Sequence, residues 1–151
     1  MNMEIIRTDS KNSDFLKLIK LLDDDLNGRY GELQKQFDKH NKVDCINDVI
    51  VIYKDKLPAA CGGFKEYASD TIELKRIFVA KDSRRQGLSK LVIKELEELA
   101  RKKGYRHAVL ETGKKQFEAI NLYKNAGYSE IQNYGPYIGN NNSICMKKEL
   151  Y

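Results

Sequence analysis

The chain has 151 residues, 41% apolar and 32% charged, a size and balance that fit one soluble globular domain over residues 1–151. No stretch approaches the roughly 18 consecutive apolar residues that a membrane span needs, and residues 1–10 are mixed polar, so we expect a cytoplasmic protein with no membrane partner. The net charge of +5 is spread among 27 basic and 22 acidic residues, which favours a local anion site over a nucleic-acid partner.

The N-terminal part is predicted to contain a short strand and two helices. An apolar run at residues 4–7 fits the strand, and Ser13-Asp14 can cap the first helix. The apolar residues of that helix recur at helical spacing and should face the core. They are Phe15, Leu18, Ile19, Leu22 and Leu26. A second, polar helix is expected after Gly31, carrying Leu33 and Phe37.

Three antiparallel strands are expected next. Residues 48–54 are rich in valine and isoleucine, and Lys54-Asp55-Lys56 has the character of a hairpin turn. Residues 57–66 form the second strand, where Gly62-Gly63 indicates a bulge or a close backbone approach. Residues 71–79 complete the run.

The C-terminal half is predicted to alternate helices with strands. The first helix carries Leu88, Leu91, Val92, Leu96, Leu99 and Ala100, with Gly104 as its cap. A strand at 105–110, a short helix from about 116 to 125 ending at Gly127, and strands at 128–131 and 143–148 follow. A polar loop with Tyr134, Pro136 and Tyr137 joins the last two strands.

The cysteines do not indicate a disulfide framework or a metal site. Cys45, Cys61 and Cys145 are odd in number and far apart, without the CxxC spacing of a zinc site. We expect reduced, packed thiols and no bound metal.

The segment of residues 74–89 carries the clearest chemical signal. A strand ends there, a turn rich in arginine and glycine follows, and a helix begins, which directs backbone N–H groups at one point beside the positive end of the helix dipole. Gly87 lets an anion approach the backbone, and Arg84 and Arg85 add charge. The segment is neither a Rossmann turn nor a Walker loop, because it lacks GxGxxG and the Gly-Lys-Ser/Thr ending.

The pattern Arg84-x-x-Gly87-x-Ser89 resembles the pyrophosphate loop of the GNAT acetyltransferases, Gln/Arg-x-x-Gly-x-Gly/Ala, with Ser89 departing from the usual residue. The resemblance spans residues 72–128 and includes Ala119-Ile120-x-Leu122-Tyr123-x-x-x-Gly127-Tyr128, which looks like the A-x-x-L-Y-x-x-x-G-F segment of that family. It implies an α/β (α+β) GNAT fold. Such a fold has a mixed, mostly antiparallel sheet of about seven strands, flanked by about four helices, with a V-shaped splay between strands four and five.

The resemblance also implies acetyl-CoA as the donor. Its pantetheine arm would lie in the splay against the backbone of Ile77, Phe78 and Val79, and the Val79 amide would polarise the thioester carbonyl. The pyrophosphate would sit on the amides of Arg85, Gln86, Gly87, Leu88 and Ser89. Gln116 stands where relatives often have an asparagine that bonds the pantetheine arm.

Acetyl transfer requires a base, because an amine with a pKa of about 10.4 is protonated near neutral pH. Glu73 is at the position where histone-modifying members of the family carry their catalytic glutamate; Glu111 and Glu66 are competing bases. Tyr123 stands where many relatives place the general acid that protonates the thiolate. Its alternative is a core tyrosine.

The acceptor is the least specified element. The resemblance implies a small-molecule or amino-acid-like amine, and a cluster of Tyr128, Tyr134, Tyr137 and Asn140-Asn141-Asn142 could wall its pocket, although the asparagines also suit turns. Alternatives are a protein or peptide N-acetyltransferase and a coenzyme A-binding sensor or assembly module without turnover. Dimers are common among relatives, so a homodimer is also an expectation.

Overall fold

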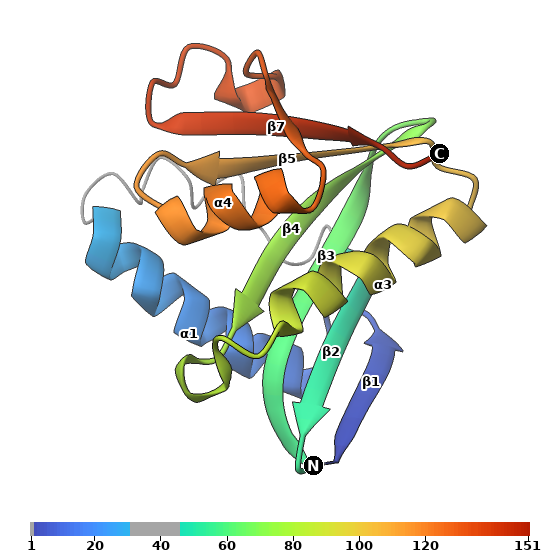
Figure 1. Cartoon of the computed structure of the whole chain (residues 1–151), viewed down its shortest axis with the longest axis vertical. Helices are drawn as coiled ribbons and strands as arrows, with labels where there is room; N and C mark the ends of the chain where they lie inside the picture. The colour runs from blue at the N-terminus through green and yellow to red at the C-terminus, as the bar shows by residue number, and fades with distance from the viewer. Residues whose placement is uncertain (1, 31–45) are drawn as a thin grey trace.

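The computed structural model describes residues 2–30 and 46–151. The elements in that part of the chain run in the following order: β1 Met3–Thr8, α1 Ser13–Tyr30, β2 Asp48–Lys54, β3 Leu57–Ala68, β4 Thr71–Val79, α3 Leu88–Lys102, β5 His107–Gly113, α4 Phe117–Asn125, β6 Ser129–Ile131 and β7 Ser143–Glu149 (Figure 1). Short 3-10 helices lie at Lys81–Ser83 and Gly135–Tyr137. The polar helix expected after Gly31 falls outside the described residues.

The strands form one seven-stranded sheet in the order β1-β2-β3-β4-β5-β7-β6. Every neighbouring pair is antiparallel except β4 and β5, which are parallel. A hairpin cannot join parallel strands, so the chain crosses from β4 to β5 through α3. The predicted mixed, mostly antiparallel sheet of the GNAT fold is confirmed.

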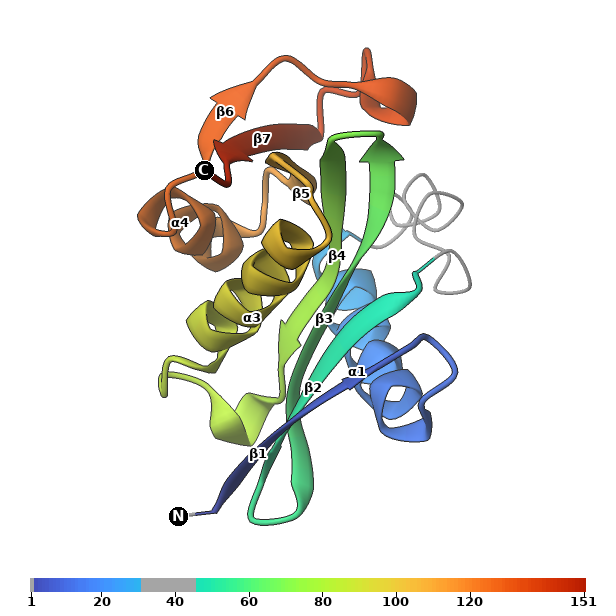
Figure 2. The same ribbon diagram turned by 90° about the vertical axis from the view of Figure 1, so that its right-hand side faces the viewer.

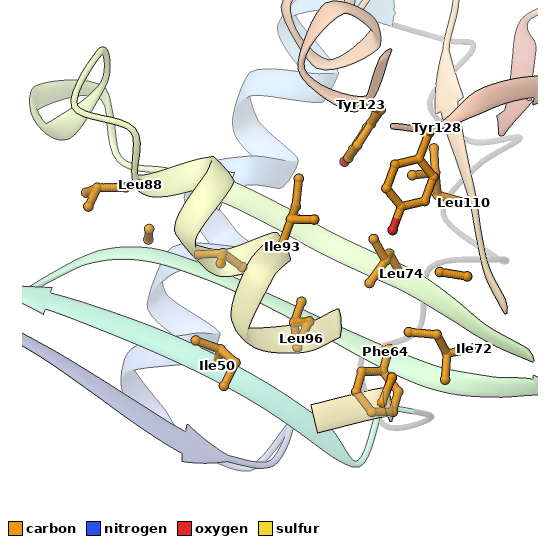
Figure 3. Close-up of a cluster of buried hydrophobic side chains, with 14 of the residues drawn as sticks. Ile50, Phe64, Ile72, Leu74, Leu88, Ile93, Leu96, Leu110, Tyr123 and Tyr128 are labelled. Atoms are coloured by element: carbon orange, nitrogen blue, oxygen red, sulfur yellow. The ribbon is translucent and has the colours of Figure 1, made fainter. Parts of the chain in front are cut away.

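Helices cover both faces of the sheet, with α1 on one face and α3 and α4 on the other (Figure 2). The larger apolar core lies under α3, where Leu88, Ile93 and Leu96 face the side chains of the sheet (Figure 3). A second cluster forms where Phe15 and Leu18 of α1 pack on the opposite face. Within the described residues, no helix has the length and apolar character needed to cross a membrane.

A bulge between β3 and β4 bends the middle of the sheet. Cys61 pairs with Phe78, whereas Gly63 pairs with Lys75, so β4 holds one more residue than β3 between these pairs. Arg76 lies inside this stretch with a φ of 59°. The irregularity predicted at Gly62-Gly63 is therefore present, and its extra residue belongs to the partner strand.

Several predicted boundaries differ from the observed ones by one to three residues, and two features at element ends show why. The cap of α1 is Asn12 rather than Ser13-Asp14, because Asn12 Oδ1 accepts hydrogen bonds from the amides of Asp14 at 3.0 Å and Phe15 at 2.9 Å. The strand expected from residue 105 begins at His107. The amide of Tyr105 instead donates to the carbonyl of Ala100 at 3.0 Å and so closes the end of α3.

Candidate active site

The sheet opens between β4 and β5. The two strands pair over three positions only, from Thr71 opposite His107 to Glu73 opposite Val109. Beyond that point β4 stays paired with β3, whereas β5 stays paired with β7 as far as Gly113. The strands therefore diverge, as Figure 1 shows, and the predicted V-shaped splay is confirmed.

The turn after β4 leads into the N-terminus of α3, and we call residues 84–89 the anion loop. Arg85 and Gly87 have φ angles of 65° and 76°, so the backbone reverses sharply before the helix. Gly87 is the N-cap residue, and no described side chain caps this helix end. The first amides of α3 are thus available at the positive end of the helix dipole, an arrangement that binds phosphate.

A cavity of about 500 Å³ lies against the anion loop and extends between β4, α1 and α4. Most of the predicted site residues line this cavity. They are Ile77, Phe78, Val79, Arg84, Arg85, Gly87, Leu88, Ser89, Gln116 and Tyr123. Sequence reasoning did not assign Leu22 and Asp25 of α1, which also line it. Their three-residue spacing places them on one helix face, but only the packed structure shows that this face meets the cavity.

The end of the cavity at the anion loop is positively charged. Arg84, Arg85 and Lys90 line it there. The Arg84 guanidinium lies 5.7 Å from the ring centre of Phe78, and its Nε donates to the carbonyl oxygen of Val79 at 3.1 Å. These contacts fix Arg84 between the end of β4 and the loop.

The side chain of Gln86 is directed away from the cavity, which it does not line. Its amide oxygen accepts a hydrogen bond from Nζ of Lys54 at the end of β2. Any contact of Gln86 with an anion in the loop would therefore involve its backbone N–H.

Tyr123 of α4 reaches the cavity from the side of the sheet that α3 covers. Its side chain is 8% exposed and packs edge to face against Tyr128, with ring centres 6.0 Å apart. Burial raises the pKa of the Tyr123 phenol well above its ordinary value, and the nearby Glu111 carboxylate raises it further. The phenol therefore stays protonated and can donate a hydrogen bond into the cavity.

Glu73 does not line the cavity. It is held in a charged network on the face of the sheet opposite to the one that α3 covers. The Tyr134 hydroxyl donates to its Oε2 at 2.6 Å, and the ammonium groups of Lys65 and Lys75 lie 3.6 Å and 3.7 Å from its Oε1. Burial lowers the pKa of Lys75, and the Glu73 carboxylate opposes that shift. Glu73 thus has its negative charge balanced by two lysines.

Glu111 is the other carboxylate near the splay. Its Oε2 accepts a hydrogen bond from the Ser143 hydroxyl at 2.7 Å. Burial raises the pKa of Glu111 to about 7, although the Ser143 hydrogen bond and the Lys75 ammonium oppose the shift. Neither Glu111 nor Glu66 lines the cavity, and Glu66 is bonded to the Tyr105 hydroxyl at an exposed position, at 2.8 Å.

The predicted tyrosine cluster is divided between the two faces of the sheet. Tyr134 and Tyr137 contact each other edge to face, with ring centres 5.5 Å apart, near Glu73 and Lys75. Tyr128 instead lies in the core under α3 and donates to Glu97 at 2.8 Å, so its inclusion in that cluster was wrong. Tyr128 precedes β6, and its amide donates to the carbonyl of Tyr123 at 3.0 Å, which closes the end of α4.

The asparagines of the loop before β7 serve its turns. Asn140 Oδ1 accepts from the amide of Asn142 at 2.9 Å, and the side chain of Asn133 donates to the carbonyls of Tyr137 and Asn140. These bonds support the turn interpretation of the asparagine run and fix the start of β7 at Ser143.

Comparison with known proteins gives concordant results. The profile of the acetyltransferase (GNAT) family matches residues 15–128. An uncharacterized N-acetyltransferase of Bacillus subtilis, YsnE, is 34% identical over 94 residues, which make up 61% of this chain and 62% of YsnE. N-acetyltransferase family 8 member 2 of Rattus norvegicus is 35% identical over 63 residues, 42% of this chain and 28% of that protein. The chain thus spans less than two thirds of either curated relative.

Solved structures agree along almost the whole chain. A Klebsiella pneumoniae protein assigned as an acyl-CoA N-acyltransferase superposes with a TM-score of 0.81 at 25% identity, covering 99% of this chain and 98% of that one. The PaiA N-acetyltransferase of Thermoplasma acidophilum, solved in complex with coenzyme A, has the same fold, with a TM-score of 0.74 at 16% identity and 99% coverage of both chains. With the family profile, the splayed sheet and the anion loop in agreement, the chain belongs to the acetyltransferase (GNAT) family.

Proposed function

We propose that the protein transfers the acetyl group of acetyl-CoA to the primary amine of a small-molecule or amino-acid-like acceptor. The observation that carries this proposal is the anion loop, which opens onto the gap between β4 and β5. Its available helix amides and three cationic side chains suit the phosphates of coenzyme A. The coenzyme A held by the Thermoplasma acidophilum neighbour supports the same donor.

The donor would follow the cavity from the anion loop into the gap. Its pyrophosphate would accept hydrogen bonds from the amides of residues 85–89, and its pantetheine arm would pair with the backbone of residues 77–79. The amide of Val79 would then polarise the thioester carbonyl, and Gln116 would bond the arm from the start of α4. All of these residues except Gln86 line the cavity.

The acceptor would reach the thioester from the side of α1. Asp25 lines the cavity there, and its carboxylate would attract the ammonium form of an amine. Once the amine is deprotonated, its nitrogen attacks the thioester carbon and the carbon–sulfur bond breaks. Tyr123 would supply the hydrogen bond and the proton that the departing sulfur needs, and Glu73 or Glu111 would take the amine proton.

Donor binding is tested with two glycine variants. Gly87→Glu places bulk and negative charge in the anion loop, and we expect it to weaken acetyl-CoA binding in calorimetry by about 100-fold or more, because like charges repel at short range. Gly104→Glu is the matched control, because Gly104 also has a positive φ, 93° against 76°, and open space around it, but lies at the other end of α3. Equal donor affinity in the two variants would show that the phosphates bind elsewhere.

Turnover is tested with the unmodified protein. Release of free thiol from acetyl-CoA should depend on an added amine when diamines, amino-acid amides and lysine-containing peptides are compared. A preference for the peptides would identify a protein or peptide acetyltransferase. Tight donor binding without turnover on any amine would identify a coenzyme A-binding module instead.

A further inference from the structure

Glu73 and Glu111 occupy different places relative to the gap between β4 and β5. Glu73 is at the last position where the two strands pair, opposite Val109, whereas Glu111 lies two residues further along β5. Residues two apart in a strand share a face, so Glu111 projects on the same face as Val109. Leu110 between them belongs to the core under α3, which places Glu111 on the α1 face where the strands have already separated.

The two carboxylates also differ in what holds them. Glu73 is 3% exposed, with two ammonium groups within 4 Å and a tyrosine hydroxyl bonded to it. These neighbours balance the charge of the Glu73 carboxylate. Glu111 is only partly buried and receives one hydrogen bond, from the Ser143 hydroxyl to its Oε2.

The position of Ser143 is well defined. Its side chain is 4% exposed, and it begins β7 directly opposite Gly113 of β5. The amide of Ser143 donates to the carbonyl of Asn140 at 3.2 Å, so the preceding turn fixes the residue from the other side. The hydroxyl is thus a preorganised donor and not a mobile surface group.

We propose that Ser143 is a positioning residue that holds the Glu111 carboxylate at the mouth of the gap, and that Glu111 accepts the proton of the acceptor amine. This inference rests on the proposed acetyl transfer. As the nitrogen–carbon bond forms, the amine proton passes to the Glu111 carboxylate. The carbon–sulfur bond breaks, the sulfur takes the phenolic proton of Tyr123, and proton exchange with solvent restores both groups. The products are the amide and free coenzyme A.

Several ionisable groups face Glu111 from the elements around it. Lys75 and Glu73 face it from β4, Tyr123 from α4, Tyr137 from the 3-10 helix, and Cys145 from β7. The Lys75 ammonium favours the ionised form of Glu111 and the Glu73 carboxylate disfavours it, while burial raises the pKa of the Tyr123 and Tyr137 phenols and of the Cys145 thiol. The Ser143 hydroxyl favours the carboxylate through a hydrogen bond that can be removed without changing any charge.

The first test measures the ionisation of Glu111 itself. In carbon-13 carboxyl NMR of the unliganded protein, Ser143→Ala should raise the pKa of Glu111 by about one unit, because it removes a donor to the charged form. Ser143→Thr should restore the original titration. Thr112→Val is the matched control, since Thr112 is also 4% exposed but adjoins Glu111 on the opposite face of β5. An unchanged titration in Ser143→Ala would overturn the positioning role.

The second test is the pH profile of kcat/KM with a saturating donor. In the unmodified protein kcat/KM should rise through pH about 7, and Ser143→Ala should move that rise upward by about one pH unit while rates at pH 9 stay similar. Glu111→Gln should remove the rise and lower kcat by about 100-fold, whereas Glu73→Gln should keep it. Loss of the rise in Glu73→Gln alone would overturn the assignment of Glu111. A protein that acetylates no amine would refute the proposed function, and the NMR titration would still report on Ser143.

Discussion

Tyr123 has two properties that a proton donor at the thioester needs. It lines the cavity, and burial keeps its phenol protonated. We expect Tyr123→Phe to lower kcat at least about tenfold while acetyl-CoA affinity in calorimetry stays nearly unchanged, because only the hydroxyl is lost. Tyr128→Phe is the matched control, since Tyr128 packs against Tyr123 but bonds to Glu97 in the core. Equal turnover of Tyr123→Phe and the parent protein would remove this phenol from the mechanism.

The ionisation of Glu111 should also affect stability. Its pKa of about 7 in the folded protein is above the value of about 4.3 expected for the unfolded chain, so between these values the folded state binds more protons. The contribution of the protonated Glu111 carboxyl to the free energy of unfolding is fully present below pH about 4.3 and is lost as the pH rises to about 7. Glu111→Gln removes this loss, so its melting temperature relative to the parent should be higher at pH 8 than at pH 5.

Glu73→Gln should behave in the opposite way. It removes the carboxylate that balances the charges of Lys65 and Lys75. The buried Lys75 ammonium then lacks the Glu73 carboxylate beside it. We expect a lower melting temperature at pH 8, measured by calorimetry beside Glu111→Gln. A gain in stability for both variants would show that the two carboxylates have equivalent surroundings.

The identities of the loop residues could be predicted from the sequence, but the directions of their side chains could not. The spacing of Arg84, Gly87 and Ser89 was assigned through its resemblance to the pyrophosphate loop of the family, and all three residues line the cavity. The direction of Gln86 depends on Lys54, which is distant in sequence. The network around Glu73 likewise depends on tertiary contacts that no local pattern contains.

At the scale of the elements, the packing of α3 on β3 depends on Gly62. A Cβ atom built on this residue would lie 2.5 Å from Cδ1 of Ile77 and 2.6 Å from Cγ1 of Val92. Gly62→Ala should therefore destabilise the fold by about 1–3 kcal/mol in denaturant unfolding, since the core must shift to accept the methyl group.

The same substitution in α1 should have the opposite sign. Gly28 lies in an exposed helical position where an added Cβ meets nothing within 4 Å. Gly28→Ala should stabilise the protein by about 0.5–1 kcal/mol, because alanine loses less backbone freedom in a helix than glycine does. If both variants shifted stability in one direction, the close approach at Gly62 would not control the packing of α3.

Strands and helices with a clear periodicity were predicted with nearly the observed bounds, including β2 and β4. One error fell at an end where a non-local bond decides the boundary. Arg106, predicted as strand, has its amide bonded to the carbonyl of Asp70 at 2.8 Å instead of to a neighbour within β5. The β4–β5 splay itself entered through the family resemblance, because no periodicity shows where two parallel strands stop pairing.

At the scale of the whole molecule, the sheet consists of two parts with a short junction. Strands β1 to β4 form one antiparallel run, strands β5, β7 and β6 form another, and three parallel positions join them. On one side the cavity is lined by α1 and β4, which belong to the first part, and by the anion loop, which begins the crossover from β4 to β5. On the other side it is lined by α4, which belongs to the second part. A donor in the cavity would therefore bridge both parts.

This bridging predicts a specific pattern of hydrogen exchange. Acetyl-CoA at about 100 times its Kd should stabilise the protein by about 2.7 kcal/mol and raise its melting temperature by about 5–10 °C. In exchange measured by mass spectrometry, peptides that contain residues 77–79 and 85–89 should be protected first, because the donor would bond their amides. Protection should extend to α4 and β5, since opening the junction would then require release of the donor. The same concentration should leave exchange in Gly87→Glu unchanged. Protection confined to the anion loop would mean that the phosphates bind there while the rest of the donor remains outside the gap.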